Sequence, residues 1–270
     1  MSDQRSFGQV VSKDGVSISY ERQGSGPPLI LIVGALCSRA LGPSVKLAPL
    51  LARQFTVFSY DRRGRNESGD RAPYRVEREL EDLEALIAEA GGSARVFGHS
   101  SGALLGLRAA RHGLPIRRLA LYEAPLIVDR ARPPMQADWE RIRSHIADAR
   151  RSEALDVFLK SVGLPGIVRM LMRLFPVWSK LEAVAHTLVY DGEISEEFQR
   201  GEPLSMDAWS SVTVPVLAVA GGRSPAWMQQ GMRALATALP NAEFRTLQGQ
   251  THDVSARAVE PLLNQFFAGL

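Results

Sequence analysis

One segment, ARVFGHSSGALLGLRAA from Ala94 to Ala110, restricts the possible folds of this chain more than any other. It opens with a short apolar run, typical of a buried strand, and ends with alanines and leucines at helical spacing. Between these parts, Ser100 and Ser101 are flanked by glycines, which permit a tight turn. A strand that passes directly into a helix favours a parallel sheet. Ser100 is therefore either a capping residue of this turn or an exposed nucleophile.

The same alternation of strands and helices runs through most of the chain. Asp14 and Gly15 separate two strands near the N-terminus, which predicts an antiparallel hairpin. Further strands are predicted at 27–34, 55–61, 94–99, 117–123, 214–222 and 242–249, and helices at 45–53, 76–90, 101–113, 225–240 and from 255 onward. We therefore expect an α/β fold with about eight mostly parallel strands, flanked by helices and joined by right-handed crossovers.

Residues 125–211 interrupt this alternation with a helical stretch that lacks clear strands. We predict that they form a helical cap inserted after the sixth strand, and that residues 1–124 and 212–270 form the core. In open sheets of this kind, ligands bind beyond the carboxyl ends of the strands. Ser100 lies at such an end, which favours a site between the core and the cap.

Charge and cysteine content exclude several classes of protein. The 270 residues carry a net charge of +3, and the arginines are scattered singly or in pairs, which is typical of solvated surface rather than of a nucleic-acid-binding patch. No apolar run reaches membrane-spanning length, the first residues do not resemble a signal peptide, and Cys37 has no second cysteine to pair with. We expect a cytoplasmic protein that binds neither nucleic acid nor membrane. The sequence leaves its oligomeric state open.

Three motifs together resemble those of the α/β-hydrolase superfamily, over nearly the whole chain apart from the insertion. The first is GHSSG at 98–102, which is similar to the elbow that lifts a serine nucleophile above the sheet. The second is YDRRGRNES at 60–68, which is similar to the D-x-R-G-x-G-x-S loop of many members, with Asn66 in place of a glycine. The third is GQTHDV at 249–254, which looks like the loop that supplies the family's catalytic histidine. The resemblance implies the α/β-hydrolase fold and a nucleophilic Ser100.

The resemblance also implies a catalytic triad of Ser100, His252 and an acid. A serine hydroxyl needs a neighbouring base to accept its proton, and His252 follows the last predicted strand. The loop after the seventh strand, GGRSPAW, contains no acid. Glu123 ends the sixth strand at the same edge of the sheet, where some members carry the acid, so we predict that it orients His252. Asp253 is expected to point elsewhere, and Glu243 to lie within the eighth strand.

Two backbone amides are expected to stabilise the oxyanion of an acyl-transfer intermediate. One is the amide of Ser101, directly after the nucleophile. By resemblance to the loop after the third strand, the other is the amide of Ala35, with Leu36 as the alternative, because Val33 replaces the usual histidine before the glycine. Cys37, near this loop, is expected to be a small apolar residue without redox chemistry.

Large apolar side chains in the insertion suggest a roof over Ser100, although most of them are also suited to the insertion's own core. The candidates for substrate contact are Leu36, His99, Trp139, Met170, Phe175 and Trp178. The turn geometry should aim His99 away from Ser100. These residues favour a hydrophobic acyl or alcohol portion over a sugar or a phosphate. No Rossmann, Walker or metal-ligand pattern is present, so we expect neither cofactor nor metal.

The function that these features favour is a cofactor-free serine hydrolase that cleaves a carboxylic ester or lactone through an acyl-Ser100 intermediate. One alternative on the same scaffold is cleavage of a carbon–carbon bond in a β-diketone, or a lyase reaction. Another is a receptor or carrier that binds a small molecule without turnover, because the usual acid after the seventh strand is missing.

Overall fold

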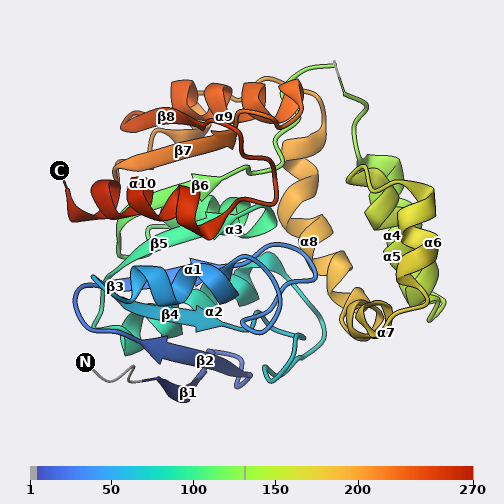
Figure 1. Ribbon diagram of the computed structural model, residues 1–270, viewed down its shortest axis with the longest axis horizontal. Helices are drawn as coiled ribbons and strands as arrows, with labels where there is room; N and C mark the ends of the chain where they lie inside the picture. The colour runs from blue at the N-terminus through green and yellow to red at the C-terminus, as the bar shows by residue number, and fades with distance from the viewer. Residues whose placement is uncertain (1–4, 131, 270) are drawn as a thin grey trace.

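The structure, a computed structural model, describes residues 5–130 and 132–269 (Figure 1). Its centre is an eight-stranded sheet in the order β1-β2-β4-β3-β5-β6-β7-β8. β2 pairs antiparallel with β1 and with β4, and the other pairs are parallel. The strands are β1 (Ser6–Val11), β2 (Ser17–Gln23), β3 (Pro28–Ile32), β4 (Thr56–Tyr60), β5 (Ala94–His99), β6 (Ile116–Tyr122), β7 (Val216–Gly221) and β8 (Ala242–Leu247). The predicted mostly parallel sheet with its N-terminal hairpin is confirmed.

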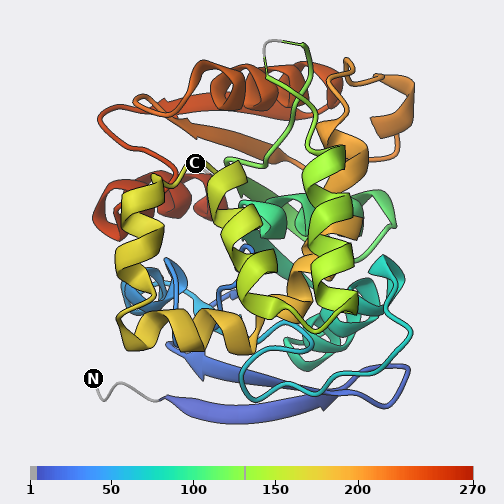
Figure 2. The ribbon, with the colours of Figure 1, turned by 90° about the vertical axis from the view of Figure 1, so that its right-hand side faces the viewer.

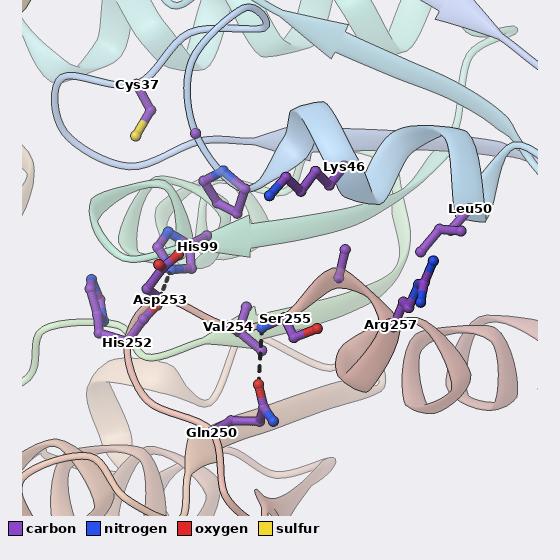
Figure 3. Close-up of a pocket in the computed structure, with 13 residues that line it drawn as sticks. Cys37, Lys46, Leu50, His99, Gln250, His252, Asp253, Val254, Ser255 and Arg257 are labelled. Carbon is purple, nitrogen blue, oxygen red and sulfur yellow. Dashed lines mark hydrogen bonds between the residues drawn. The ribbon is translucent and has the colours of Figure 1, made fainter. Parts of the chain in front are cut away.

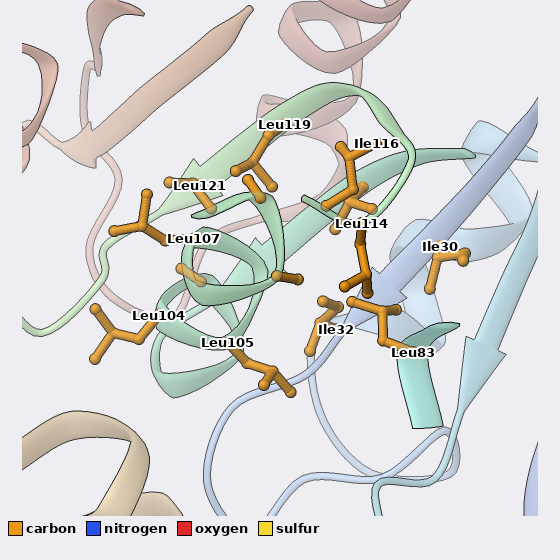
Figure 4. Packing of buried hydrophobic residues seen from close by; sticks show 14 of the residues in the cluster. Ile30, Ile32, Leu83, Leu104, Leu105, Leu107, Leu114, Ile116, Leu119 and Leu121 are labelled. Atoms are coloured by element: carbon orange, nitrogen blue, oxygen red, sulfur yellow. The ribbon is translucent and has the colours of Figure 1, made fainter. Parts of the chain in front are cut away.

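Helices cover both faces of this sheet. The core helices are α1 (Ser44–Leu51), α2 (Val76–Glu89), α3 (Ser101–Arg111), α9 (Ala226–Ala238) and α10 (Ala256–Ala268). In β3, Leu29 and Leu31 pack in one apolar cluster with α1 and α10. Ile30 and Ile32 pack in a second cluster with α2, α3 and α9, part of which Figure 4 shows. Because successive side chains of a strand point to opposite faces, burial of both faces explains the uninterrupted apolar run of β3.

The chain between β6 and β7, called the insertion below, contains helices and no strand among its described residues. Its elements are α4 (Gln136–Ala147), α5 (Arg151–Ser161), α6 (Gly166–Met172), α7 (Pro176–Ala183), α8 (Leu188–Ser195) and the 3₁₀ turns Ala185–Thr187, Glu196–Gln199 and Asp207–Trp209. α8 packs against α2 and α3 of the core. The other four helices lie further from the sheet, as Figures 1 and 2 show.

A helix that crosses a bilayer needs about 20 mostly apolar residues. Within residues 5–130 and 132–269, no helix is both long enough and apolar enough to cross a membrane.

Candidate active site

Ser100 occupies a strained turn between β5 and α3. Its backbone has φ 57° and ψ −127°, a conformation that residues with a side chain rarely adopt. The turn also demands glycine on both sides: a Cβ at Gly98 would lie 2.5 Å from the carbonyl oxygen of Gly102, and one at Gly102 would lie 2.4 Å from the carbonyl oxygen of Ile32. The amide of Ser100 donates to the carbonyl oxygen of Tyr122 in the neighbouring strand (3.0 Å). Strand pairing and tight packing therefore hold the hydroxyl at the carboxyl edge of the sheet.

Glu123 and His252 meet at the same edge. Glu123 follows β6, is fully buried and also has a positive φ of 47°. Its Oε2 accepts a hydrogen bond from His252 Nδ1 (2.8 Å), and its Oε1 accepts one from the amide of Gly221 (2.6 Å). Burial alone would raise the pKa of this carboxyl, but these hydrogen bonds outweigh it and hold the pKa below its ordinary value of 4.5. The carboxylate therefore stays ionised and fixes the tautomer in which His252 Nε2 is free to accept a proton.

A cavity of about 210 Å³ lies between the core and the insertion and brings the predicted residues together. Ser100 and His252 line it, as do Ala35 and Ser101, the two residues expected to supply amide donors. From the insertion, Trp139 reaches the same cavity. The structure thus places both the core residues and one of the predicted roof residues around a single, partly open cavity.

Three other roof candidates do not reach this cavity. Met170 and Phe175 are 59% and 61% exposed, on α6 and directly before α7. Trp178 is buried, but within the insertion, where its indole N–H donates to Ser152 Oγ (2.9 Å). The structure thus places these three residues away from the Ser100 cavity, and their contact with substrate stays a prediction. The physical reason is that α6 and α7 each pack against α5 in the insertion, so their apolar side chains contact α5 or are exposed to solvent.

The two candidates near the nucleophile also lie elsewhere. Leu36 is buried against the insertion and lines a separate pocket beside Asn66. His99 lines a groove of about 910 Å³ with Cys37 and Lys46 (Figure 3). The last residue of β5 points to the other face of the sheet from the elbow, so His99 is turned away from the cavity, as the turn geometry predicts.

His99 stabilises the loop that carries His252. Its Nε2 donates to the carbonyl oxygen of His252 (2.9 Å), and its ring stacks on Tyr122 at 5.7 Å between centroids. Burial lowers the pKa of His99 to about 3, so this imidazole stays neutral and the hydrogen bond persists near neutral pH. The groove in Figure 3 is thus separated from the 210 Å³ cavity by the His252 loop, which borders both.

A buried charge network beside Ser101 was not predicted. Arg62 and Arg65, from the loop after β4, each donate to Asp191 of α8 at 2.7 Å, and Ser101 Oγ donates to the same carboxylate at 2.7 Å. Both arginines are almost completely inaccessible to solvent, which corrects the assignment of the arginines to solvated surface for this loop. The sequence feature that could have indicated these buried arginines is the motif YDRRGRNES, in which they directly follow a buried strand.

Sequence reasoning also missed charged and aromatic residues of the cavity wall. Arg132 precedes α4, and Trp227 lies in the first turn of α9. Both line the cavity with Ser100. Sequence periodicity does not indicate that either residue lines the cavity. Arg132 lies in an irregular segment, and Trp227 reaches the cavity only because α9 packs beside the insertion. Among the described residues, no group of three or more His, Cys, Asp or Glu side chains is arranged to hold a metal ion.

Fold and site together define a class of protein, and comparison with known proteins agrees. Residues 29–263 match the alpha/beta hydrolase family, so the chain belongs to that family. An alpha/beta hydrolase from Sphaerobacter thermophilus has a similar structure, with a TM-score of 0.88 and 46% sequence identity over 96% of this chain and 100% of that one. The predicted fold class and the resemblance to the superfamily are confirmed.

Two curated relatives match shorter parts of the chain. The uncharacterized hydrolase YraK of Bacillus subtilis is 39% identical over 100 residues, which are 34% of this chain and 35% of that protein. N-formylmaleamate deformylase of Pseudomonas putida is 32% identical over 120 residues, 43% of this chain and 44% of that protein. The chain thus spans less than half the length of these two relatives in the matched regions.

Proposed function

We propose that this protein hydrolyses a small carboxylic ester through an acyl-enzyme intermediate on Ser100. The observation that carries the proposal is the 2.8 Å hydrogen bond from His252 Nδ1 to buried Glu123, beside a cavity that Ser100 and His252 both line. A carboxylate on Nδ1 stabilises the imidazolium that forms when Nε2 takes a proton. The missing acid after β7 is thereby replaced by an acid after β6.

In the proposed reaction, Ser100 Oγ attacks the ester carbonyl carbon while His252 Nε2 accepts the hydroxyl proton. The tetrahedral oxyanion is stabilised by the amides of Ser101 and Ala35, neither of which donates a hydrogen bond elsewhere in the described chain. Collapse breaks the carbonyl carbon–alkoxide bond, and His252 gives its proton to the leaving alcohol. Water then attacks the acyl carbon with His252 as base, which releases the acid and restores the Ser100 hydroxyl.

Residues 125–211 are the proposed cap of this site. α8 attaches the insertion to the core, and α4 and α5 carry the cavity wall above Ser100 through Trp139 and Phe158. A wall of this kind limits the access of water to Ser100, and fewer waters around the oxyanion strengthen its electrostatic interactions with the amides.

A fluorophosphonate probe tests the nucleophile directly. The wild-type protein should be labelled and should hydrolyse p-nitrophenyl acetate, and Ser100→Ala should lose both properties. Its melting temperature should stay near that of the wild type, because the hydroxyl contributes little packing. Ser179→Ala, which removes an exposed hydroxyl on α7, is the matched control and should label normally. Failure of the wild type to label would favour the receptor alternative.

Glu123→Gln tests the acid. The amide keeps the shape but cannot balance an imidazolium, so kcat should fall by about three to four orders of magnitude. Asp253→Asn is the control, because Asp253 is exposed and adjoins His252 in sequence without lining the cavity. Equal losses in the two variants would contradict the assignment of Glu123.

A further inference from the structure

Arg132 is a cation placed in the wall of the Ser100 cavity. Its guanidinium lies over the ring of Trp227, 4.2 Å from the centroid, and its Nη2 donates to the carbonyl oxygen of Ser161 (2.6 Å). The Met135 sulfur lies 3.9 Å from the same nitrogen. An aromatic face and a carbonyl oxygen hold the group in position without neutralising its charge.

Within the described residues, no carboxylate forms an ion pair with Arg132, and its Nε and Nη1 groups donate no hydrogen bond. Partial burial lowers the pKa of this guanidinium, which reflects the cost of keeping the charged form away from water. An arginine has five N–H donors and remains protonated in proteins. Asp138 is near enough to raise the pKa of Arg132, but its carboxylate pairs with Arg141 (3.8 Å) and is 37% exposed. Among the described residues, the site therefore presents unused donors and a positive charge without an ion-pair partner.

The other charges near the cavity do not offset Arg132. Asp191 lines the cavity, but its two oxygens accept from Arg62 and Arg65 at 2.7 Å each. Glu123 lies behind His252 and accepts from Gly221 and His252. Each carboxylate is thus engaged by its own partners, and the charge left for a ligand is positive.

The size and the remaining wall of the cavity limit what can bind there. A volume of about 210 Å³ equals roughly seven water molecules at the density of the liquid. Trp139, Phe158 and Met228 supply apolar surface between the ends of this space. A fitting substrate is therefore short, has an apolar middle and ends in an anion.

The geometry points to a substrate that carries a second, free carboxylate, bound by Arg132 while Ser100 attacks its ester. The substrate class is a half-ester of a short dicarboxylic acid, in which a few methylenes separate the two carboxyl groups. The unused N–H groups of Arg132 match the two oxygens of a carboxylate, and such pairs gain both energy and orientation. This inference rests on the proposed function, because it assumes that the ester is cleaved at Ser100.

Two esters of equal chain length test the inference: mono-p-nitrophenyl glutarate and p-nitrophenyl pentanoate, which differ by the terminal carboxylate. The wild type should have the higher kcat/KM for the glutarate ester. Arg132→Met should lower the ratio of the two kcat/KM values about 10- to 100-fold, mainly through KM, because a hydrogen-bonded charge pair is lost. Arg132→Lys should restore part of the ratio. A ratio unchanged in Arg132→Met, or a wild-type preference for pentanoate, overturns the inference.

Arg111→Met is the matched control, because Arg111 also lies over a tryptophan ring, that of Trp209 at 4.9 Å, but outside the cavity. In Arg111→Met, the ratio of the kcat/KM values for the two esters should equal that of the wild type. If neither ester is cleaved, the proposed function fails, and thermal shifts decide the inference separately. Glutarate should then raise the melting temperature of the wild type more than that of Arg132→Met. Equal shifts in the two proteins would overturn the role of Arg132.

Discussion

Two aspartates of the insertion, Asp191 and Asp156, each bond two arginines, yet they lie in contrasting surroundings. Asp191 of α8 pairs with Arg62 and Arg65 at 2.7 Å, and all three side chains are at most 1% exposed. Asp156 of α5 pairs with Arg169 at 3.1 Å and Arg173 at 3.2 Å, and its side chain is 32% exposed. The same chemical arrangement thus occurs once in the interior and once at the surface.

The difference in burial between the Asp191 and Asp156 clusters shows how the insertion is attached to the core. The partners of Asp191 come from the loop after β4 and from Ser101, so α8 is tied to the core beside the proposed nucleophile. The partners of Asp156 follow it in the insertion itself, so that cluster joins outer helices to each other. Burial makes the first cluster costly to break, whereas water and salt screen the second.

The largest expected effect is that of Asp191→Ala. Removing Asp191 leaves the buried Arg65 without a carboxylate partner, while Arg62 keeps its pair with Glu79 at 2.6 Å, so the free energy of unfolding should fall by about 3 to 5 kcal/mol. Asp156→Ala removes two partly exposed pairs and should lower the free energy of unfolding by less than about 1 kcal/mol. Urea denaturation of both variants measures the comparison. Equal losses would show that burial does not distinguish the two clusters.

A smaller but still large effect is expected inside the outer helices. Trp178 is buried between α7 and α5, and Trp178→Ala should lower the free energy of unfolding by about 3 kcal/mol, since it leaves a cavity and removes the hydrogen bond to Ser152. Denaturation followed by circular dichroism measures the loss. A loss below about 1 kcal/mol would show that these helices contribute little to the overall stability.

At acid pH, Asp191 should contribute less to the free energy of unfolding. Burial would raise the pKa of this carboxyl, but Arg65 and Arg62 outweigh it and hold the folded-state pKa below the ordinary value of 3.8. A folded pKa below the unfolded one stabilises the protein in full above about pH 5, and this stabilisation is lost as the pH falls through both values. The difference in unfolding free energy between wild type and Asp191→Ala should therefore narrow below about pH 4. A constant difference down to the acid transition would refute this linkage.

The smallest effect is expected at the surface of the insertion. Phe175 is 61% exposed, so Phe175→Ser should change the free energy of unfolding by less than about 0.5 kcal/mol and leave ester hydrolysis intact. Paired measurements of denaturation and kcat/KM test this expectation. A marked rise in KM in Phe175→Ser would indicate that Phe175 contacts the substrate, contrary to its exposed position in the structure.

The sequence by itself determined the sheet, its flanking helices and the turn that holds Ser100. These features depend on local patterns: apolar runs such as that of β3 are buried on both faces, and glycines 98 and 102 stand where a Cβ would collide with backbone. The resemblance to the α/β-hydrolase superfamily added Glu123 and His252, whose loops the predicted order of strands places at one edge of the sheet. Apolar periodicity and turn residues suffice to predict the strands, the helices and the turn, since each of these depends on residues that are neighbours in the chain.

Only the tertiary structure decided which distant side chains meet. Asp191 lies 126 residues from Arg65 along the chain, and Arg132 reaches the cavity from an irregular segment. The roof candidates Trp139 and Phe175 are both aromatic, but one lines the cavity and the other is exposed. Composition cannot separate them, because burial is set by how whole helices pack rather than by the residue itself. The same holds for buried charges. Sequence alone predicts that an arginine is exposed, because the carboxylate that allows its burial is brought near it only by the packing of the fold.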